Sequence, residues 1–136
     1  MSVGVLLVTH NGLGPDLLNC ASRVLPIMPL KVDCLEVPWD GTSPELLALN
    51  LRSLLRELDE GQGVLILVDL YGSTPSNVAH LVEPGRLVER VYGVNLPMLL
   101  RVLNYPQLSL SELAAVAIEG GRTGVMAEDG LADGDR

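Results

Sequence analysis

Four stretches of the chain carry the hydrophobic pattern of β-strands. Residues 3–8 and 63–68 are almost unbroken apolar runs, which is typical of strands that are covered on both faces of a sheet. Residues 31–37 mix polar and apolar positions and suit an edge strand, while residues 86–94 give a weaker fourth candidate. We therefore predict a sheet with two buried strands at its centre.

Helical periodicity fills the segments between these strands. The first helix places five apolar residues on one face: Leu17, Leu18, Ala21, Val24 and Leu25. The second follows a capping Ser43 and does the same with Leu47, Leu51, Leu54, Leu55 and Leu58. We expect further helices to begin at Thr74–Pro75, near Leu96–Pro97, and at Ser109 or Ser111, the last running to about Gly120–Gly121, where glycine permits a stop.

The alternation of strands and helices predicts the fold class. It is typical of an α/β domain with an open, mainly parallel sheet and helices on both faces, a flavodoxin-like three-layer sandwich of strand order 2-1-3-4. In such sheets, ligands and chemistry gather at the carboxyl ends of the strands, where the strand order reverses. We expect residues 1–127 to form this domain and residues 128–136 to be a frayed acidic tail.

The composition fits one globular domain. Hydrophobic residues make up 48% of the chain and charged residues 19%. No apolar run is long enough to span a membrane, and residues 1–9 lack the features of a signal peptide, so we expect a cytoplasmic protein. The net charge of −8 argues against binding of a nucleic-acid backbone and allows a basic protein partner. Cys20 and Cys34 are expected to be buried, reduced thiols.

The first and third strands both end near residues that can do chemistry. His10 lies at the end of the first strand, and Asp69 directly follows the third. If these strands are neighbours, the two side chains lie side by side. A carboxylate that accepts one imidazole N–H fixes the tautomer and leaves the other ring nitrogen free as a nucleophile. We therefore predict that His10 is a nucleophile oriented by Asp69.

The residues after this carboxylate predict a place for an anion. Gly72 and Ser73 form a tight turn, Thr74 is expected to cap the next helix, and Pro75 suits its first position. The free N–H groups of such a helix end attract anions, so the histidine, the carboxylate and the turn together predict phosphoryl transfer. Three further polar residues at the strand ends are expected to support the loops: Thr9, Asn11 and Asn95.

Each of these residues also has a simpler interpretation. His10 could be an ordinary loop residue, Asp69 could merely begin a turn, and Thr74–Pro75 could merely cap a helix. Their joint position at the predicted switch point favours a function. His80 has no evident carboxylate partner, and we expect it to have a surface or packing role.

The sequence lacks residues that several other kinds of site require. Gly12-Leu13-Gly14 resembles the start of a dinucleotide-binding loop, but Leu17 stands where its third small residue belongs. No G-x-x-x-x-G-K-[ST] motif is present, which excludes a P-loop kinase. A response-regulator receiver would need acidic residues in place of Thr9-His10 and a late lysine, whereas Lys31 is the only lysine. The histidine and the carboxylate alone give too few ligands for a metal ion.

Four ordered segments of the chain resemble one protein family. They are residues 5–10, 63–77, 93–99 and 113–125. In order and spacing they are similar to the IIA component of the mannose/fructose (EIIA-Man) family of the phosphoenolpyruvate-dependent sugar phosphotransferase system, the PTS. The resemblance covers about residues 3–127, nearly the whole chain.

The resemblance implies a phosphotransferase that works through phosphohistidine. His10 would take a phosphoryl group from the histidine carrier protein HPr and pass it to a IIB component for carbohydrate uptake, without a nucleotide, a metal or another cofactor. Asp69 matches the family's histidine-orienting aspartate, and Thr74 matches its phosphate-contacting Ser/Thr. The resemblance also implies a homodimer, which can associate peripherally with a membrane IIC/IID complex.

The chain departs from the family pattern at two places. Ser73 stands where the family usually has a second glycine, which stiffens the turn or adds a hydroxyl. Residues 126–134 are a poor strand, although the mannose branch exchanges a strand there between subunits, so we expect dimerisation to use another surface. The sequence also leaves open a regulatory phosphoprotein, which would signal the phosphorylation state of the PTS by binding a partner without moving sugar.

Overall fold

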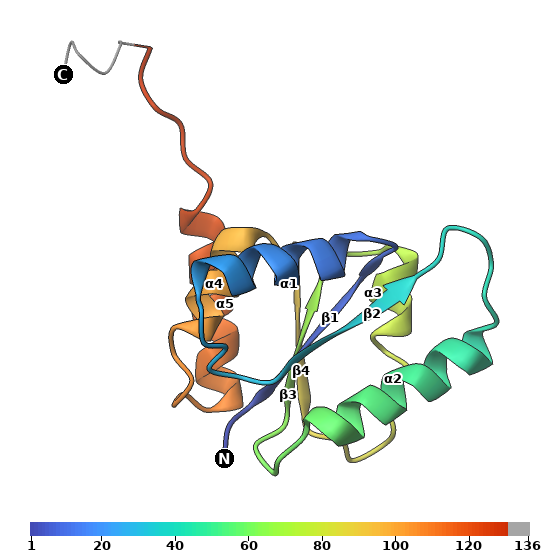
Figure 1. The fold of residues 1–136 in the computed structure, drawn as a ribbon. Helices are drawn as coiled ribbons and strands as arrows, with labels where there is room; N and C mark the ends of the chain where they lie inside the picture. Colours follow the sequence, from blue (N-terminus) through green and yellow to red (C-terminus); the bar gives the residue numbers. More distant parts are fainter. Residues whose placement is uncertain (131–136) are drawn as a thin grey trace.

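Parallel pairing joins the strands into one sheet of order β2-β1-β3-β4. The computed structural model describes residues 1–130, and its strands are β1 (Gly4–His10), β2 (Val32–Val37), β3 (Val64–Val68) and β4 (Val88–Tyr92) (Figure 1). All three strand pairs are parallel. The α/β class, the strand order and the edge position of β2 are therefore as predicted.

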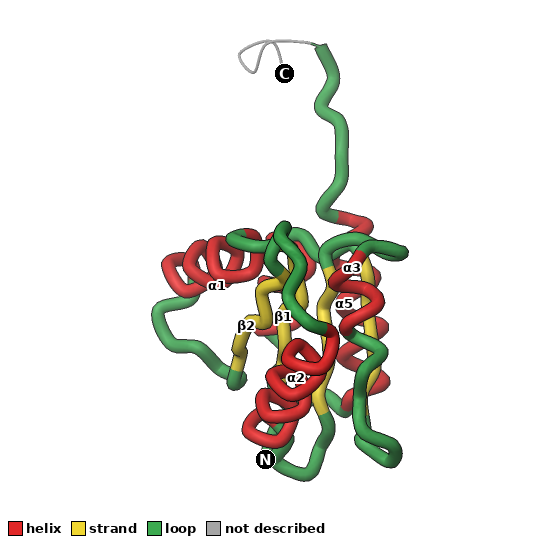
Figure 2. Tube along the Cα trace, turned by 90° about the vertical axis from the view of Figure 1, so that its right-hand side faces the viewer, coloured by secondary structure: helices red, strands yellow, loops and turns green. Residues whose placement is uncertain are grey.

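Helices cover both faces of this sheet (Figure 2). They are α1 (Leu13–Val24), α2 (Pro44–Leu58), α3 (Thr74–Val78), α4 (Leu96–Leu103) and α5 (Leu110–Thr123). Buried residues of α1, α4 and α5 pack on one face, and those of α2 and α3 pack on the other. The predicted three-layer sandwich is confirmed.

Successive residues of the central strands point to opposite faces of the sheet. Leu7 and Leu67 belong to the core beneath α1, α4 and α5, whereas Leu6 and Ile66 belong to the core beneath α2 and α3. All four side chains have no exposed surface. Because both faces are covered, the inner positions of β1 and β3 carry apolar side chains on both sides, and the two strands appear in the sequence as nearly continuous hydrophobic runs.

The strand register gathers three loops around His10. Val8 pairs with Val68, so Asp69 leaves β3 level with the end of β1. On the other side of β1, His10 pairs with Val37, the last residue of β2. The loops after β1, β2 and β3 therefore leave the sheet at the same edge.

Two of the helices have serine at their N-cap positions, as predicted. The hydroxyl of Ser43 accepts the N–H of Leu46 at the start of α2. The Ser109 hydroxyl accepts the N–H of Glu112, and the Ser109 backbone N–H donates to the Glu112 carboxylate, which forms a capping box at the start of α5. Of the two candidates for this cap, Ser109 is the correct one.

The predicted stop of α5 at its glycine pair is wrong, because the helix continues to Thr123. Both glycines are buried against α4. A Cβ atom added to Gly120 would lie 2.5 Å from Cβ of Arg101, and one added to Gly121 would lie 2.8 Å from Cε of Met98. The pair therefore allows the two helices to approach closely and does not end α5.

Two expectations about residues of α1 are also wrong. Val24 is 57% exposed, because it is the last residue of the helix and does not reach the core. Cys20 is exposed, while Cys34 in β2 is half-buried, and both are free thiols. Ala21 occupies the core side of α1, and a neighbouring residue of a helix points roughly 100° away, which turns Cys20 to solvent.

After α5, residues 125–130 form neither helix nor strand and lead away from the body of the fold (Figure 1). The predicted tail, 128–136, and the predicted poor strand, 126–134, both extend beyond the described residues, which end at 130. Within residues 1–130, no helix combines the length and the apolar character that crossing a membrane requires.

Candidate functional site

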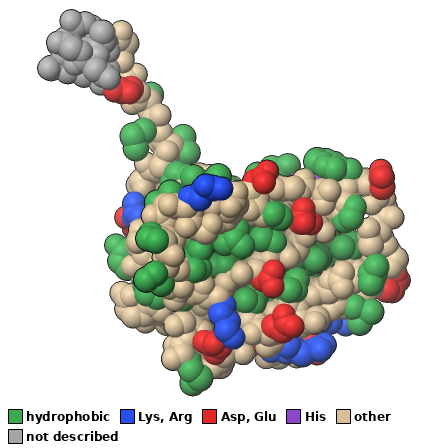
Figure 3. All heavy atoms as spheres, in the orientation of Figure 1, with side chains coloured by type: hydrophobic (Ala, Val, Ile, Leu, Met, Phe, Trp, Pro, Cys, Tyr) green, Lys and Arg blue, Asp and Glu red, His purple; other side chains and the backbone are tan. Residues whose placement is uncertain are grey.

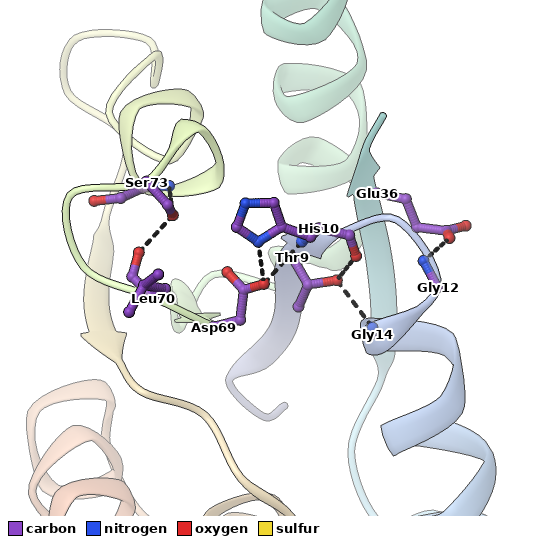
Figure 4. A network of polar contacts seen from close by, with 9 residues as sticks. Thr9, His10, Gly12, Gly14, Glu36, Asp69, Leu70 and Ser73 are labelled. Atoms are coloured by element: carbon purple, nitrogen blue, oxygen red, sulfur yellow. Dashed lines mark hydrogen bonds and ion pairs between the residues drawn. The ribbon is translucent and has the colours of Figure 1, made fainter. Parts of the chain in front are cut away.

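One carboxylate oxygen holds His10, the last residue of β1, at two points. Oδ2 of Asp69 lies 2.7 Å from Nδ1 of the His10 ring and 2.9 Å from the His10 backbone nitrogen (Figure 4). Because a carboxylate only accepts hydrogen bonds, this contact assigns the proton of the neutral imidazole to Nδ1 and leaves the lone pair on Nε2. The Asp69 side chain is 7% exposed and the His10 side chain 23%. The carboxylate is thus shielded, while the ring still reaches the surface.

Thr9 joins the end of β1 to the start of α1. Its fully buried hydroxyl donates to the carbonyl of His10 at 2.8 Å and accepts the N–H of Gly14 at 2.9 Å. Gly12, at the N-cap position of α1, has no side chain to cap the helix, so the Thr9 hydroxyl satisfies one of its first N–H groups. Glu36 of β2 accepts the N–H of Gly12 at 2.7 Å. The loop after His10 is therefore tied to both neighbouring elements.

Ser73, rather than Thr74, is the N-cap of α3, which corrects the prediction by one residue. The Ser73 hydroxyl accepts the N–H of Ser76 and donates to the carbonyl of Leu70. Thr74 and Pro75 are the first two residues of the helix. Proline suits either of these positions, because the first N–H groups of a helix have no partner within it, and so Pro75 did not fix the boundary.

The turn between β3 and α3 keeps only a few backbone donors free. Pro75 has no N–H, and the N–H groups of Ser73, Ser76 and Asn77 are bonded within the turn and α3. Among residues 1–130, the N–H groups of Leu70, Tyr71, Gly72 and Thr74 find no acceptor, and the exposed Thr74 hydroxyl has no partner. Of these donors, Gly72 and Thr74 adjoin the N-cap residue Ser73. The anion site predicted here therefore offers fewer free N–H groups than a helix N-terminus whose first N–H groups are all unpaired.

The remaining predicted residues lie outside this contact network. Asn11 is exposed and makes no hydrogen bond within the described part of the chain. Asn95 caps α4 and donates to a carbonyl of α5, so its contacts are structural. His80 is exposed, its Nδ1 lies 2.8 Å from the Ser76 carbonyl oxygen, and no described carboxylate contacts its ring.

The donor set at this edge offers a metal ion too few ligands. Among residues 1–130, no group of three or more His, Cys, Asp or Glu side chains could hold one. The carboxylate of Glu36, which comes from the neighbouring strand, is engaged by Gly12. The arrangement matches instead an imidazole nucleophile with an orienting carboxylate.

The model of the EIIA-man family, whose description is "PTS system fructose IIA component", matches residues 4–118. The chain belongs to this family. It is thus a IIA component of the mannose/fructose branch of the PTS, and the related PTS IIA proteins are components of phosphotransferases.

Two relatives and one solved structure show the extent of this similarity. The PTS system mannose-specific EIIAB component of Escherichia coli (strain K12) is 34% identical over 134 residues, which is 93% of this chain and 40% of the relative. The chain thus spans well under half of that relative. The PTS system fructose-specific EIIA component of Bacillus subtilis (strain 168) is 35% identical over 77 residues, which is 55% of this chain and 53% of the relative. The mannose/sorbose specific IIA subunit from Enterococcus faecalis has the same fold, with a TM-score of 0.83, 22% identity, and coverage of 97% and 98% of the two chains.

Trp39 is a site residue of this IIA component that the sequence analysis did not single out. Its indole lies on the His10 imidazole, with ring centroids 4.6 Å apart and planes inclined by 18°. It follows β2 by two residues and is 76% exposed. Once β2 is paired with β1, the register of His10 with Val37 brings Trp39 to the His10 ring. An isolated tryptophan directly after a strand of the sheet was the signal available in the sequence.

Proposed function

We propose that this IIA component accepts a phosphoryl group on Nε2 of His10 from phosphorylated HPr and passes it to a IIB component. The observation that carries the proposal is the 2.7 Å contact between Nδ1 of His10 and Oδ2 of Asp69. It puts the proton on Nδ1 and so leaves Nε2 as the only ring nitrogen with a free lone pair.

The transfer step moves one phosphoryl group between two imidazole rings. The lone pair of Nε2 of His10 forms a new N–P bond, while the N–P bond of the donor phosphohistidine breaks and its electron pair returns to the donor nitrogen. The proton on Nδ1 of His10 stays in place. The phosphorylated ring therefore gains positive charge, which the neighbouring Asp69 carboxylate offsets at 2.7 Å.

The turn before α3 supplies donors for the phosphoryl oxygens. The N–H groups of Gly72 and Thr74 and the Thr74 hydroxyl have no other partner among residues 1–130. The α3 helix packs against β1, and Figure 4 shows its first turn next to the His10 ring. We therefore assign phosphate binding chiefly to Gly72 and Thr74, while Ser73 fixes the turn with its hydroxyl.

Exposed apolar side chains near this edge suit a protein donor. Leu13, Leu70 and Tyr71 are 42%, 61% and 74% exposed, and they lie on the loops and helix start that follow β1 and β3. Exposed apolar surface marks protein interaction sites where it is contiguous, and these side chains all lie on segments that leave the sheet at the edge that holds His10. On the face drawn in Figure 3, basic side chains are interspersed with acidic ones, and the net charge of −8 attracts a basic partner over longer distances.

A phosphorylation assay with matched histidine variants tests the proposal. The parent protein is incubated with labelled phosphoenolpyruvate, enzyme I and HPr. The phosphoryl label on the protein should be stable in base and labile in acid. His10→Ala should remove all label. His80→Ala should keep it, because His80 has no carboxylate partner among the described residues. Labelling that survives His10→Ala would overturn the assignment.

A second assay separates transport from regulation. The phosphorylated protein is mixed with candidate IIB proteins, and the loss of phosphate from His10 is followed in time. Transfer to a IIB protein supports the carrier role. Phosphorylation without transfer to any cognate IIB protein favours the regulatory phosphoprotein. The homodimer and the association with a membrane IIC/IID complex stay predictions from the family resemblance.

A further inference from the structure

An exposed aromatic side chain lies face to face on the nucleophilic ring. The centroids of the Trp39 and His10 rings are 4.6 Å apart, and their planes are inclined by 18°, which is a stacked arrangement. The Trp39 residue is 76% exposed, so the core does not hold its indole in place. The position of this side chain is therefore explained by the contact with His10 and not by burial in the fold.

Two contacts constrain the His10 ring in different directions. The bond from Nδ1 to Asp69 fixes one atom of the ring, but a hydrogen bond tolerates tens of degrees of misalignment, so the ring plane can still tilt about that atom. An aromatic ring packed on the face of the imidazole restricts this tilt. Trp39 is well placed for this, because Val37 pairs with His10 and Pro38 fixes the backbone between Val37 and Trp39.

We propose that Trp39 is a positioning residue, which holds the His10 imidazole in the plane that directs Nε2 toward the incoming phosphoryl group. The proposal deepens the function given above and rests on it. Trp39 does not touch the reacting bond. It raises the fraction of time in which the lone pair of Nε2 points at the phosphorus atom.

An exposed tryptophan beside a nucleophile could instead contact the protein donor, and a small donor separates the two roles. Phosphoramidate has no protein surface. In its reaction the lone pair of Nε2 forms the N–P bond as the P–N bond of phosphoramidate breaks and ammonia leaves with the electron pair. Ring positioning affects this reaction and the reaction with phospho-HPr alike, whereas docking affects only the second.

The test compares four proteins in a His80→Ala background, which leaves His10 as the only histidine. They are the parent, Trp39→Ala, Trp39→Phe and Tyr105→Ala. Tyr105 is an exposed ring beyond the end of α4, at the opposite edge of the sheet from His10, and serves as the matched control. The rate of phosphohistidine formation is measured with phosphoramidate and with phospho-HPr, after circular dichroism has verified the fold of each variant.

We expect Trp39→Ala to slow both reactions by about three- to tenfold, the range that one aromatic pair is worth. Trp39→Phe should recover most of the rate, and Tyr105→Ala should match the parent. Proton NMR gives an independent check of the geometry. The ring protons of His10 should be shifted upfield by the indole in the parent, and this shift should be absent in Trp39→Ala.

Two outcomes would overturn the proposal. The first is a phosphoramidate rate that is the same in Trp39→Ala and the parent; a loss with phospho-HPr alone would then assign Trp39 to docking. The second is a Phe variant as slow as the Ala variant. The proposed function fails separately, if the parent takes no phosphoryl group from phospho-HPr while phosphoramidate still phosphorylates His10.

Discussion

Within residues 1–130, Asp69 makes all of its side-chain hydrogen bonds to His10. Its Oδ2 atom contacts both the ring and the backbone of that residue, and its Oδ1 atom is buried without a partner among residues 1–130. A buried carboxylate oxygen without a hydrogen bond costs free energy. The position is therefore poorly explained as a turn residue that merely stabilises the fold.

Asp69→Asn tests this orientation. Asparagine keeps the size and an acceptor for the His10 backbone N–H, but it removes the charge and can favour the wrong tautomer. We expect a folded protein that takes up phosphate more slowly by roughly one to four powers of ten, the range for a lost orienting or proton-transfer group. Rapid-quench measurement of phosphorylation by phospho-HPr gives the rate. A variant as fast as the parent would reduce Asp69 to a structural residue.

Substitutions at Ser73 and Thr74 should have different effects, the first on the stability of the fold and the second on phosphate binding. Ser73→Ala removes the cap of α3 and should lower the free energy of unfolding by about 0.5–2 kcal/mol. Thr74→Ala removes a hydroxyl that has no partner in the described part of the chain, so the free energy of unfolding should change by less than about 0.5 kcal/mol.

Phosphorylation by phospho-HPr should instead slow by about tenfold in Thr74→Ala, the lower end for a lost hydrogen bond to a charged group. Denaturant melts give the stability of both variants. Ser73→Gly is the matched control, because glycine at an N-cap position lowers the stability by only a few tenths of a kcal/mol. If Thr74→Ala unfolds more easily than Ser73→Ala, the assignment of the cap is wrong.

Gly120→Ala should destabilise the packing of α4 on α5. The added Cβ would lie 2.5 Å from Cβ of Arg101, which is too close for two carbon atoms. Separating the helices should cost about 1–3 kcal/mol in the free energy of unfolding, the usual range for overpacking. Thermal and urea denaturation measure this loss. Gly41→Ala, where nothing lies within 4 Å of the added atom, should be close to neutral.

The two cysteines should differ sharply in reactivity. Burial, together with the carboxylates of Asp33 and Glu36, raises the pKa of the Cys34 thiol to about 12. At pH 8 only about one Cys34 in ten thousand is then a thiolate, the form that reacts with alkylating reagents. Mass spectrometry after brief treatment with iodoacetamide should find native protein modified at the exposed Cys20 alone. Both thiols should react in denaturant, and equal labelling of the native protein would contradict this.

The sheet and the central pair of the site followed from local patterns. Continuous apolar runs indicated strands covered on both faces, and the alternation with helices implied a parallel sheet whose loops meet at one edge. Placing His10 beside Asp69 needed only the adjacency of β1 and β3. These features depend on the types of residue within single elements, which a sequence displays directly.

Most of the errors arose where two elements meet. Gly120 and Gly121 can end a helix or admit a neighbouring one, and only the position of α4 decides between these roles. Whether a residue at the end of a helix reaches the core, as for Val24, likewise depends on tertiary packing. The position of Trp39 depends on the register of β2 against β1, which its own loop does not encode.

The contact between Trp39 and His10 places an optical probe beside the proposed phosphorylation site. The chain contains one tryptophan, and the structure places that indole on the ring that we propose to be phosphorylated. The excited state of the indole, and hence its emission, depends on the charge of the adjacent imidazole. We therefore expect the fluorescence of the unlabelled protein to change as His10 gains and loses its phosphoryl group. Turnover could then be followed in real time without a radioactive donor.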